Sequence, residues 1–170
     1  MQYKYFVSAC SLIVLVAAPA NAQEDPDPAI GAYLTDYVVE TIAGNACEDL
    51  VLAGIIKTCE SSQTALFTSD GTFLTQDNNA SGPARSDSIG TWRTVNEQRY
   101  RTRAVTIYYD ENSRVSSYDV TISRFRLSNN GRRSTGTFEA RNYSAAQDPF
   151  DANEIPQFIN TGRLESRKIR

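Results

Sequence analysis

The chain has 170 residues, of which 17 are Lys or Arg and 20 are Asp or Glu, with three cysteines and no histidine. Without histidine, Ser-His-Asp, Cys-His and ordinary histidine-metal catalysis are excluded. The net charge of −3 argues against general nucleic-acid binding, which calls for an overall basic footprint. The sequence has no glycine-rich phosphate loop, dinucleotide-binding fingerprint or calcium-loop spacing, so we expect no cofactor, metal or nucleic-acid partner.

The first 22 residues have the features of a secretory signal. A basic residue precedes an apolar run over 6–18, and Ala20 and Ala22 are the small residues that a signal peptidase requires. We expect cleavage after Ala22 and a secreted or periplasmic mature chain, residues 23–170, that folds as a single domain. The apolar run is shorter than the roughly 20 residues of a transmembrane helix, so we expect no transmembrane anchor.

Two cysteines remain once the signal, which contains Cys10, is removed. In an oxidising compartment an even pair predicts a disulfide between Cys47 and Cys59. Such a bridge closes a short loop, for which the chain-entropy model gives about 3 kcal/mol. The alternative is a pair of buried free thiols.

Residues 23–60 predict a helical or mixed lead-in. Asp27 and Pro28 resemble a helix start, and apolar residues then recur at helical spacing as far as Ile42. A second apolar stretch over 50–56 predicts another short helix. The aromatic and β-branched residues over 37–42 also suit a strand, so both readings stay open for the first segment.

Residues 61–170 have the texture of an antiparallel meander, with short β-rich runs separated by turn residues. The best hairpin signal is Ser69-Asp70-Gly71. Seven strands without crossover helices favour a curled or closed sheet. The predicted strands are 65–67, 72–74, 89–94, 100–109, 117–127, 133–143 and one within 158–169.

Four arginines alternate along two of these strands, and in the predicted register they share one sheet face: Arg101, Arg103, Arg124 and Arg126. We predict this register by pairing Tyr109 with Tyr118, which sets Arg103 opposite Arg124. Arg101 then lies opposite Arg126. The apolar continuation of the same face is Val105, Ile107, Val120 and Ile122.

Neighbouring strands extend this predicted face on both sides. Upstream, pairing Gly90 with Val105 places Trp92 beside Arg103. Downstream, a three-residue Asn-Asn-Gly loop places Phe138 opposite Ile122. We therefore expect one apolar face that runs through four strands and ends in the arginines.

The arginines have two interpretations. Like charges opposed across a sheet are destabilising, and a guanidinium matches carboxylate and phosphate geometry, so the cluster indicates an anionic or carboxylate ligand. Alternatively, the stems lie on apolar surface with the charges in water. Trp92 is either a core residue or a cation–π partner of Arg103. The candidate ligand-binding residues are Trp92, Arg101, Arg103, Arg124, Arg126, Tyr109 and Tyr118.

Three acids on predicted strands are candidates for general acid–base chemistry: Asp119, Glu139 and Glu165. In the predicted register Asp119 and Glu139 point away from the apolar face. We therefore interpret them as solvated surface acids.

Gly90-Thr91-Trp92, together with the phrase over 67–73 that contains the Asp-Gly turn, resembles small exported calycin-like (lipocalin-like) β-barrel proteins over roughly residues 65–169. In lipocalins a G-x-W motif marks the first strand, and an arginine packs on the tryptophan at the closed end. The resemblance implies that Arg103 on Trp92 marks a closed end instead of a ligand mouth. This chain departs from the pattern because its motif follows a hairpin and a lead-in.

The predicted fold is mainly β: an antiparallel meander that closes into a small calycin-like barrel, with a disulfide-stapled helical N-terminal segment. The alternative is a curved sheet with packed helices, resembling the NTF2-like α+β cone.

We expect an exported protein that binds a small apolar molecule with an acidic group near the arginines. One alternative is a cofactor-independent isomerase or cyclase resembling allene oxide cyclase-like barrels, which an acid or tyrosine inside the lumen would favour. The other is a structural or interaction module with a filled barrel.

Overall fold

The structure is a computed structural model that describes residues 27–77 and 85–169; the predicted signal lies outside the described residues. The elements are β1 Gly31–Ile42, β2 Asn45–Ala46, α1 Cys47–Leu52, β3 Glu60–Phe67, β4 Thr72–Asp77, β5 Ser88–Asn96, β6 Arg99–Tyr109, β7 Val115–Leu127, the 3-10 turn η1 Asn129–Gly131, β8 Arg133–Ser144 and β9 Phe158–Lys168.

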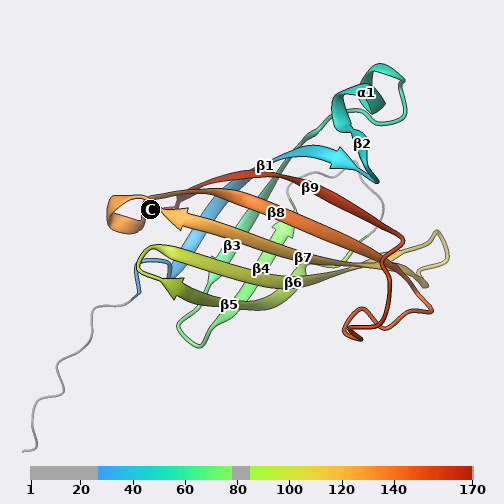
Figure 1. Cartoon of the computed structure of the whole chain (residues 1–170). Coiled ribbons are helices and arrows are strands. Elements are labelled where there is room, and N and C mark those ends of the chain that lie inside the picture. Colours follow the sequence, from blue (N-terminus) through green and yellow to red (C-terminus); the bar gives the residue numbers. More distant parts are fainter. Residues whose placement is uncertain (1–26, 78–84, 170) are drawn as a thin grey trace, which may run out of the picture.

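The sheet closes into an antiparallel barrel. Strands β1 and β3 to β9 pair in that order, and β9 pairs back onto β1, which makes eight strands with no open edge (Figure 1). The two-residue strand β2 pairs only with β1 and stays outside the barrel. The prediction of a mainly β, closed meander is therefore confirmed, and the α+β cone is excluded.

Of the two readings left open for the first segment, the strand is confirmed and the helix beginning at Asp27 is wrong, because residues 31–42 form strand β1. The carboxylate of Asp27 accepts a hydrogen bond from Ala29 N at 2.8 Å, and Ile30 N donates to Asp27 O, so this residue caps a turn. Tyr33 and Thr35 are buried at alternating positions. Aromatic and β-branched side chains suit a pleated surface, and pairing to both β3 and β9 outweighs the helical spacing.

The second predicted helix exists, but it begins earlier and is shorter than expected. Helix α1 spans Cys47–Leu52 and projects beyond the barrel with β2 (Figure 1). The predicted disulfide between Cys47 and Cys59 is confirmed, and it ties α1 to the start of β3. Disulfides are typical of oxidising, exported locations. Within the described residues, no helix is both long and apolar enough to cross a membrane.

The predicted register between β6 and β7 is wrong by two residues. Ile107 lies opposite Tyr118, and Arg101 lies opposite Arg124. The cause is a tighter turn, because the side chain of Asp110 accepts hydrogen bonds from two backbone N–H groups at 2.8 and 2.9 Å and pairing begins at Val115. A shift of two preserves the faces, since side chains alternate with period two. The four arginines do share one face, as predicted.

The predicted register between β7 and β8 is wrong by one residue, which exchanges the faces of β8. The loop holds four residues instead of three, and Ser128 N donates to Arg133 O across it. Asn130 and Gly131 both have positive φ, at 69° and 64°. Ile122 therefore lies opposite Glu139, while Phe138 lies opposite Ser123 on the other face.

The predicted pairing of β5 with β6 is also wrong by one residue. Gly90 lies opposite Ala104, and Trp92 lies opposite Thr102 instead of Arg103. A register irregularity between Thr94 and Asn96 produces the offset. Glycine is required at position 90, because a Cβ there would lie 2.0 Å from a backbone oxygen of β6.

These registers place the arginine quartet on the outside of the barrel. Buried residues such as Thr102 and Ala104 alternate with the arginines of β6 and face inward. Val120 and Ile122 lie on the outer face and are nevertheless buried. The connection 145–157 lies on this side, since the ring of Phe150 is 5.5 Å from the guanidinium carbon of Arg103.

One half of the barrel interior is filled by aromatic side chains. Phe67 contacts several other rings at centroid distances of 4.9 to 5.9 Å, and Tyr100 stacks on Phe125. Trp92 belongs to this cluster and donates from Nε1 to Thr68 O at 2.9 Å. The tryptophan is therefore part of the core at the closed end.

Candidate functional site

The other half of the barrel interior contains a cavity of about 230 Å³. Small and hydroxyl-bearing side chains occupy the inward positions here, where the closed end has aromatic rings. Their modest volume leaves the space open. The inward residues of this kind are Ser61, Thr75, Ser88, Ala104, Thr106, Thr121, Ser123 and Ala140.

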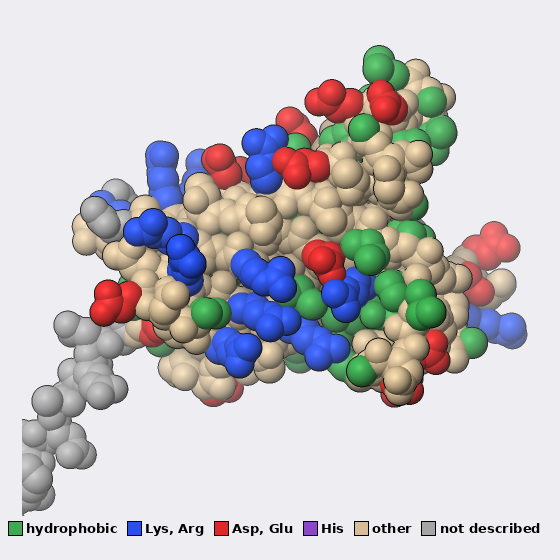
Figure 2. All heavy atoms as spheres, viewed as in Figure 1, with side chains coloured by type: hydrophobic (Ala, Val, Ile, Leu, Met, Phe, Trp, Pro, Cys, Tyr) green, Lys and Arg blue, Asp and Glu red, His purple; other side chains and the backbone are tan. Residues whose placement is uncertain are grey.

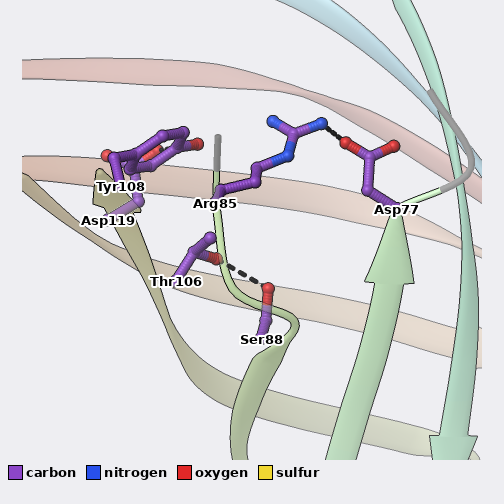
Figure 3. A network of polar contacts seen from close by, with 6 residues as sticks. All are labelled: Asp77, Arg85, Ser88, Thr106, Tyr108 and Asp119. Carbon is purple, nitrogen blue, oxygen red and sulfur yellow. Dashed lines mark hydrogen bonds and ion pairs between the residues drawn. The ribbon is translucent and has the colours of Figure 1, made fainter. Parts of the chain in front are cut away.

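Tyr108 and Asp119 lie side by side on the wall of this cavity, on the adjacent strands β6 and β7 (Figure 3). The Tyr108 hydroxyl donates to Asp119 Oδ2 at 2.9 Å, and Asn142 Nδ2 donates to Asp119 Oδ1 at 2.8 Å. Burial raises the pKa of Asp119, which its two hydrogen bonds oppose. Burial, followed by the nearby Asp119 charge, raises the pKa of Tyr108 to about 12.

An ion pair lies on the same cavity wall. Arg85 reaches from the start of the segment that leads into β5 to Asp77 at the end of β4, and the two form an ion pair (Figure 3). Ser88 and Thr106 form a hydroxyl–hydroxyl hydrogen bond of 2.6 Å beside them. The cavity therefore contains two carboxyl groups and one guanidinium, so it does not present a surplus of positive charge.

Two other polar side-chain atoms of the interior have no hydrogen-bond partner within the described residues. Asn160 Oδ1, on the cavity wall, is buried and accepts no hydrogen bond. Thr102 Oγ1, deeper in the barrel, also forms no hydrogen bond with the described residues. A buried acceptor without a donor costs about 1–3 kcal/mol, so a hydrogen-bond donor that reaches Asn160 would be bound favourably. Tyr37 closes the floor of the cavity, and burial raises the pKa of its hydroxyl.

The arrangement can bind a small molecule through hydrogen bonds, and it can move a proton. Hydroxyl groups both donate and accept, whereas an ionised Asp119 only accepts. A carboxyl group with a raised pKa, hydrogen-bonded to a tyrosine, can act as a general base next to a general acid. Within residues 27–77 and 85–169, no group of three or more His, Cys, Asp or Glu side chains is arranged to hold a metal ion.

None of the residues predicted to bind ligand lines this cavity. Trp92 lies in the closed-end cluster, and the quartet lies on the outer face. Tyr118 shares that outer face, because it lies opposite Ile107. Tyr109 pairs with Val115 at the irregular end of β6. The structure brings Arg101 and Arg124 directly together and separates Arg103 from Trp92.

Sequence reasoning misjudged Asp119. The prediction that it points away from Val120 and Ile122 is correct, but that side is the lumen and not the solvent. Glu139 shares the outer face with Ile122 and pairs with Arg141 at 2.6 Å. The signal that identifies the lumen is the run of small and hydroxyl residues at alternate positions of β6 and β7.

The fold and the site define an eight-stranded antiparallel barrel that is packed at one end and carries a polar cavity in the other half. Comparison with protein-family models, with curated proteins and with solved structures found no match.

Proposed function

We propose that this protein, exported after cleavage following Ala22, binds a small polar molecule in the open half of its barrel. The observation that carries the proposal is the cavity of about 230 Å³, whose wall combines hydroxyl groups, the Asp119 carboxyl and the unpartnered Asn160 Oδ1. Small-molecule sites typically combine a concave pocket with a few convergent polar groups. The resemblance to calycin-like barrels supports the same class of function.

The chemistry of the wall favours a ligand with hydroxyl, amine or amide groups. Asp119 and Asn160 accept hydrogen bonds, and neighbouring hydroxyls both donate and accept. An apolar acid fits this wall less well, because Arg85, the one guanidinium among the described residues that line the cavity, is already paired with Asp77. The proposed ligand therefore differs from the one expected from sequence, an apolar molecule with an acidic group, because the arginines of that prediction do not line the pocket.

Ligand-detected NMR with four probes tests the proposal: glycerol, ethanolamine, acetamide and decanoate. We expect saturation transfer to at least one of the three polar probes and little to decanoate. Thr121→Phe should abolish it, because Thr121 lies on the cavity wall, whereas Ser116→Phe on the exposed side of the same strand should not. Asp119→Asn, which keeps the shape of the side chain, should weaken the binding of ethanolamine most. Binding of decanoate alone, or equal binding to both Phe variants, would contradict the proposal.

A second candidate function is a cofactor-independent isomerase or cyclase. The observation that favours it is the hydrogen bond of 2.9 Å between Tyr108 and Asp119 within the lumen, which places an acid and a base together in a partly desolvated site. In this mechanism the Asp119 carboxylate removes a proton from carbon, and the Tyr108 hydroxyl stabilises the developing oxyanion. The bound molecule keeps its mass and changes its connectivity.

Deuterium exchange separates this mechanism from simple binding. A molecule that native mass spectrometry finds bound to the purified protein is incubated with the protein in D₂O. Wild type should incorporate deuterium at carbon, and Asp119→Asn should not. Absence of exchange in the wild type, with binding intact, would exclude the enzymatic function.

A further inference from the structure

The outer face of the barrel carries a groove of about 550 Å³ whose lining includes five arginines, and we call it the arginine groove. Figure 2 shows Lys and Arg side chains gathered on this face, over the strands that Figure 1 places in front. The groove is separate from the lumen cavity, with which it shares no lining residue. Its side chains are Arg93, Val95, Arg99, Arg101, Arg124, Arg126, Thr135 and Thr137.

Arg101 lies at the centre of a row of like charges. Arg93 lies opposite it on β5, and Arg124 lies opposite it on β7. The row continues through Thr137 to Arg163 on β9. Adjacent strands lie about 4.8 Å apart, so cationic and hydroxyl groups follow one another closely across the barrel. Directly opposed like charges are destabilising, and an anion that binds along the row relieves this repulsion.

The arginines of the groove form no ion pair with any acid of the described residues. The three ion pairs of that part of the chain involve Arg85, Arg141 and Arg163. Arg126 has no ion-pair partner among the described residues, and it donates only to the Gln98 amide oxygen, from Nη2 at 3.1 Å and from Nε at 3.4 Å. Several guanidinium groups are thus available for bidentate contacts with carboxylate or sulfate groups.

The surroundings of the groove favour a narrow chain over a broad anionic surface. The row that contains Arg126 and Thr135 continues to Glu165 on β9 and Asp36 on β1, and Glu139 lies beyond Ile122 in the row of Arg103. A flat membrane of anionic lipid would bring these carboxylates close to its phosphates, whereas an extended chain that follows the groove avoids them.

The groove also lacks what a nucleic acid would need. Nucleic-acid bases bind single-strand sites by stacking on aromatic rings. The two aromatic residues at the groove, Tyr100 and Phe125, are buried, and their rings stack with each other in the barrel interior. The exposed hydroxyls of Thr135 and Thr137 instead suit hydrogen bonds with sugar hydroxyl groups.

We propose that the arginine groove binds an acidic polysaccharide, whose carboxylate or sulfate groups pair with the arginines and whose hydroxyls meet the two threonines. The ligand is a chain longer than the lumen cavity can hold. The site is independent of the proposed function of the lumen, and each can fail without the other.

Affinity measurements with polygalacturonate and heparin test this proposal, with neutral dextran as a blank. Arg101→Gln/Arg124→Gln should lower the affinity at least tenfold. It should also reduce the slope of log Kd against log salt by about 1.4, if each lost contact contributes about 0.7, the value for single-stranded nucleic acids. Arg114→Gln/Arg167→Gln removes the same charge at exposed positions outside the groove, and should change neither by more than twofold.

Controls for folding, for the lumen and for other anionic ligands keep the test decisive. Circular dichroism should show both double variants folded, and Thr121→Phe should leave polysaccharide binding unchanged because it alters only the lumen. Equal losses of affinity in both double variants would mean that net charge alone explains the effect, and would overturn the proposal. Absence of polysaccharide binding would also overturn it, as would tighter, groove-dependent binding of phosphatidylglycerol vesicles or of a single-stranded oligonucleotide.

Discussion

Replacing Arg101 with glutamine should stabilise the free protein, because Arg101 lies directly between two other arginines. Arg93 and Arg124 oppose it on the two neighbouring strands. Opposed Cβ atoms lie about 5 Å apart, and two unit charges at that distance in water repel each other by about 0.8 kcal/mol. Guanidinium groups spread farther apart than their Cβ atoms, so the two contacts together should cost about 1 kcal/mol.

Arg103→Gln is the matched control for this prediction. Arg103 lies opposite Thr91 and Ile122, so it has no directly opposed charge, and it contacts the Phe150 ring. We expect Arg103→Gln to leave stability unchanged or to lower it slightly. The comparison also tests the register, because the pairing expected from sequence puts Arg103, and not Arg101, opposite Arg124.

Thermal unfolding followed by circular dichroism at pH 7 measures the effect. For a domain of this size, about 1 kcal/mol corresponds to a Tm shift of about 3 °C. Arg101→Gln should show this rise in 10 mM salt and lose it in 1 M salt, where the Debye length falls to about 3 Å. The reasoning is refuted if Arg101→Gln lowers Tm at low salt, or if Arg103→Gln gives the larger rise.

Three other substitutions test the closed end, the staple and the lumen. Trp92→Phe should lower the free energy of unfolding by about 1 kcal/mol in urea titrations, because the carbonyl of Thr68 loses one of its two donors and keeps only Gly71 N, while binding in the lumen stays unchanged. Cys47→Ser/Cys59→Ser should cost about 3 kcal/mol in the same assay, from the chain entropy that the loop regains. Burial raises the pKa of Asp119 in the folded protein. Its contribution to folding stability is therefore fully present below the pKa of the unfolded chain, about 4, and is lost as pH rises through the folded pKa. The stability of Asp119→Asn relative to wild type should therefore increase from pH 4 to pH 8, and a flat difference would contradict the burial of this carboxyl.

Much of the strand pattern could be predicted from sequence, because alternation along a strand determines which residues share a face. The arginine quartet shares a face because any even shift of register preserves it. The exact partners depend on the turns, and these are set by individual hydrogen bonds. The Asp110 side chain shortens one turn, and positive φ at Asn130 and Gly131 lengthens another. Such details are not visible in hydrophobic periodicity.

The lumen could not be located from sequence because both faces of the sheet bury apolar side chains. Val120 and Ile122 are buried on the outer face, beside the connection 145–157 that carries Phe150. Their hydrophobicity therefore suggests that their own face is the barrel interior, whereas the lumen lies on the other face of the strand. Asp119 directly precedes Val120 and points to the other face, so the sequence predicts that it faces the solvent, although it lines the cavity. The sequence of β1 misled for a related reason, since its apolar spacing also fits a helix.

Protein-detected NMR with ethanolamine tests the central claim, which is ligand binding in the open half of the barrel. Titration of ¹⁵N-labelled protein comprising residues 23–170 should shift the amide signals of Thr106, Thr121 and Asn160, which line the cavity, and leave those of Arg101 and Arg124 unchanged. Thr121→Phe should abolish these shifts. Shifts confined to the outer face, or no shifts in the lumen with any of the three polar probes, would contradict the account.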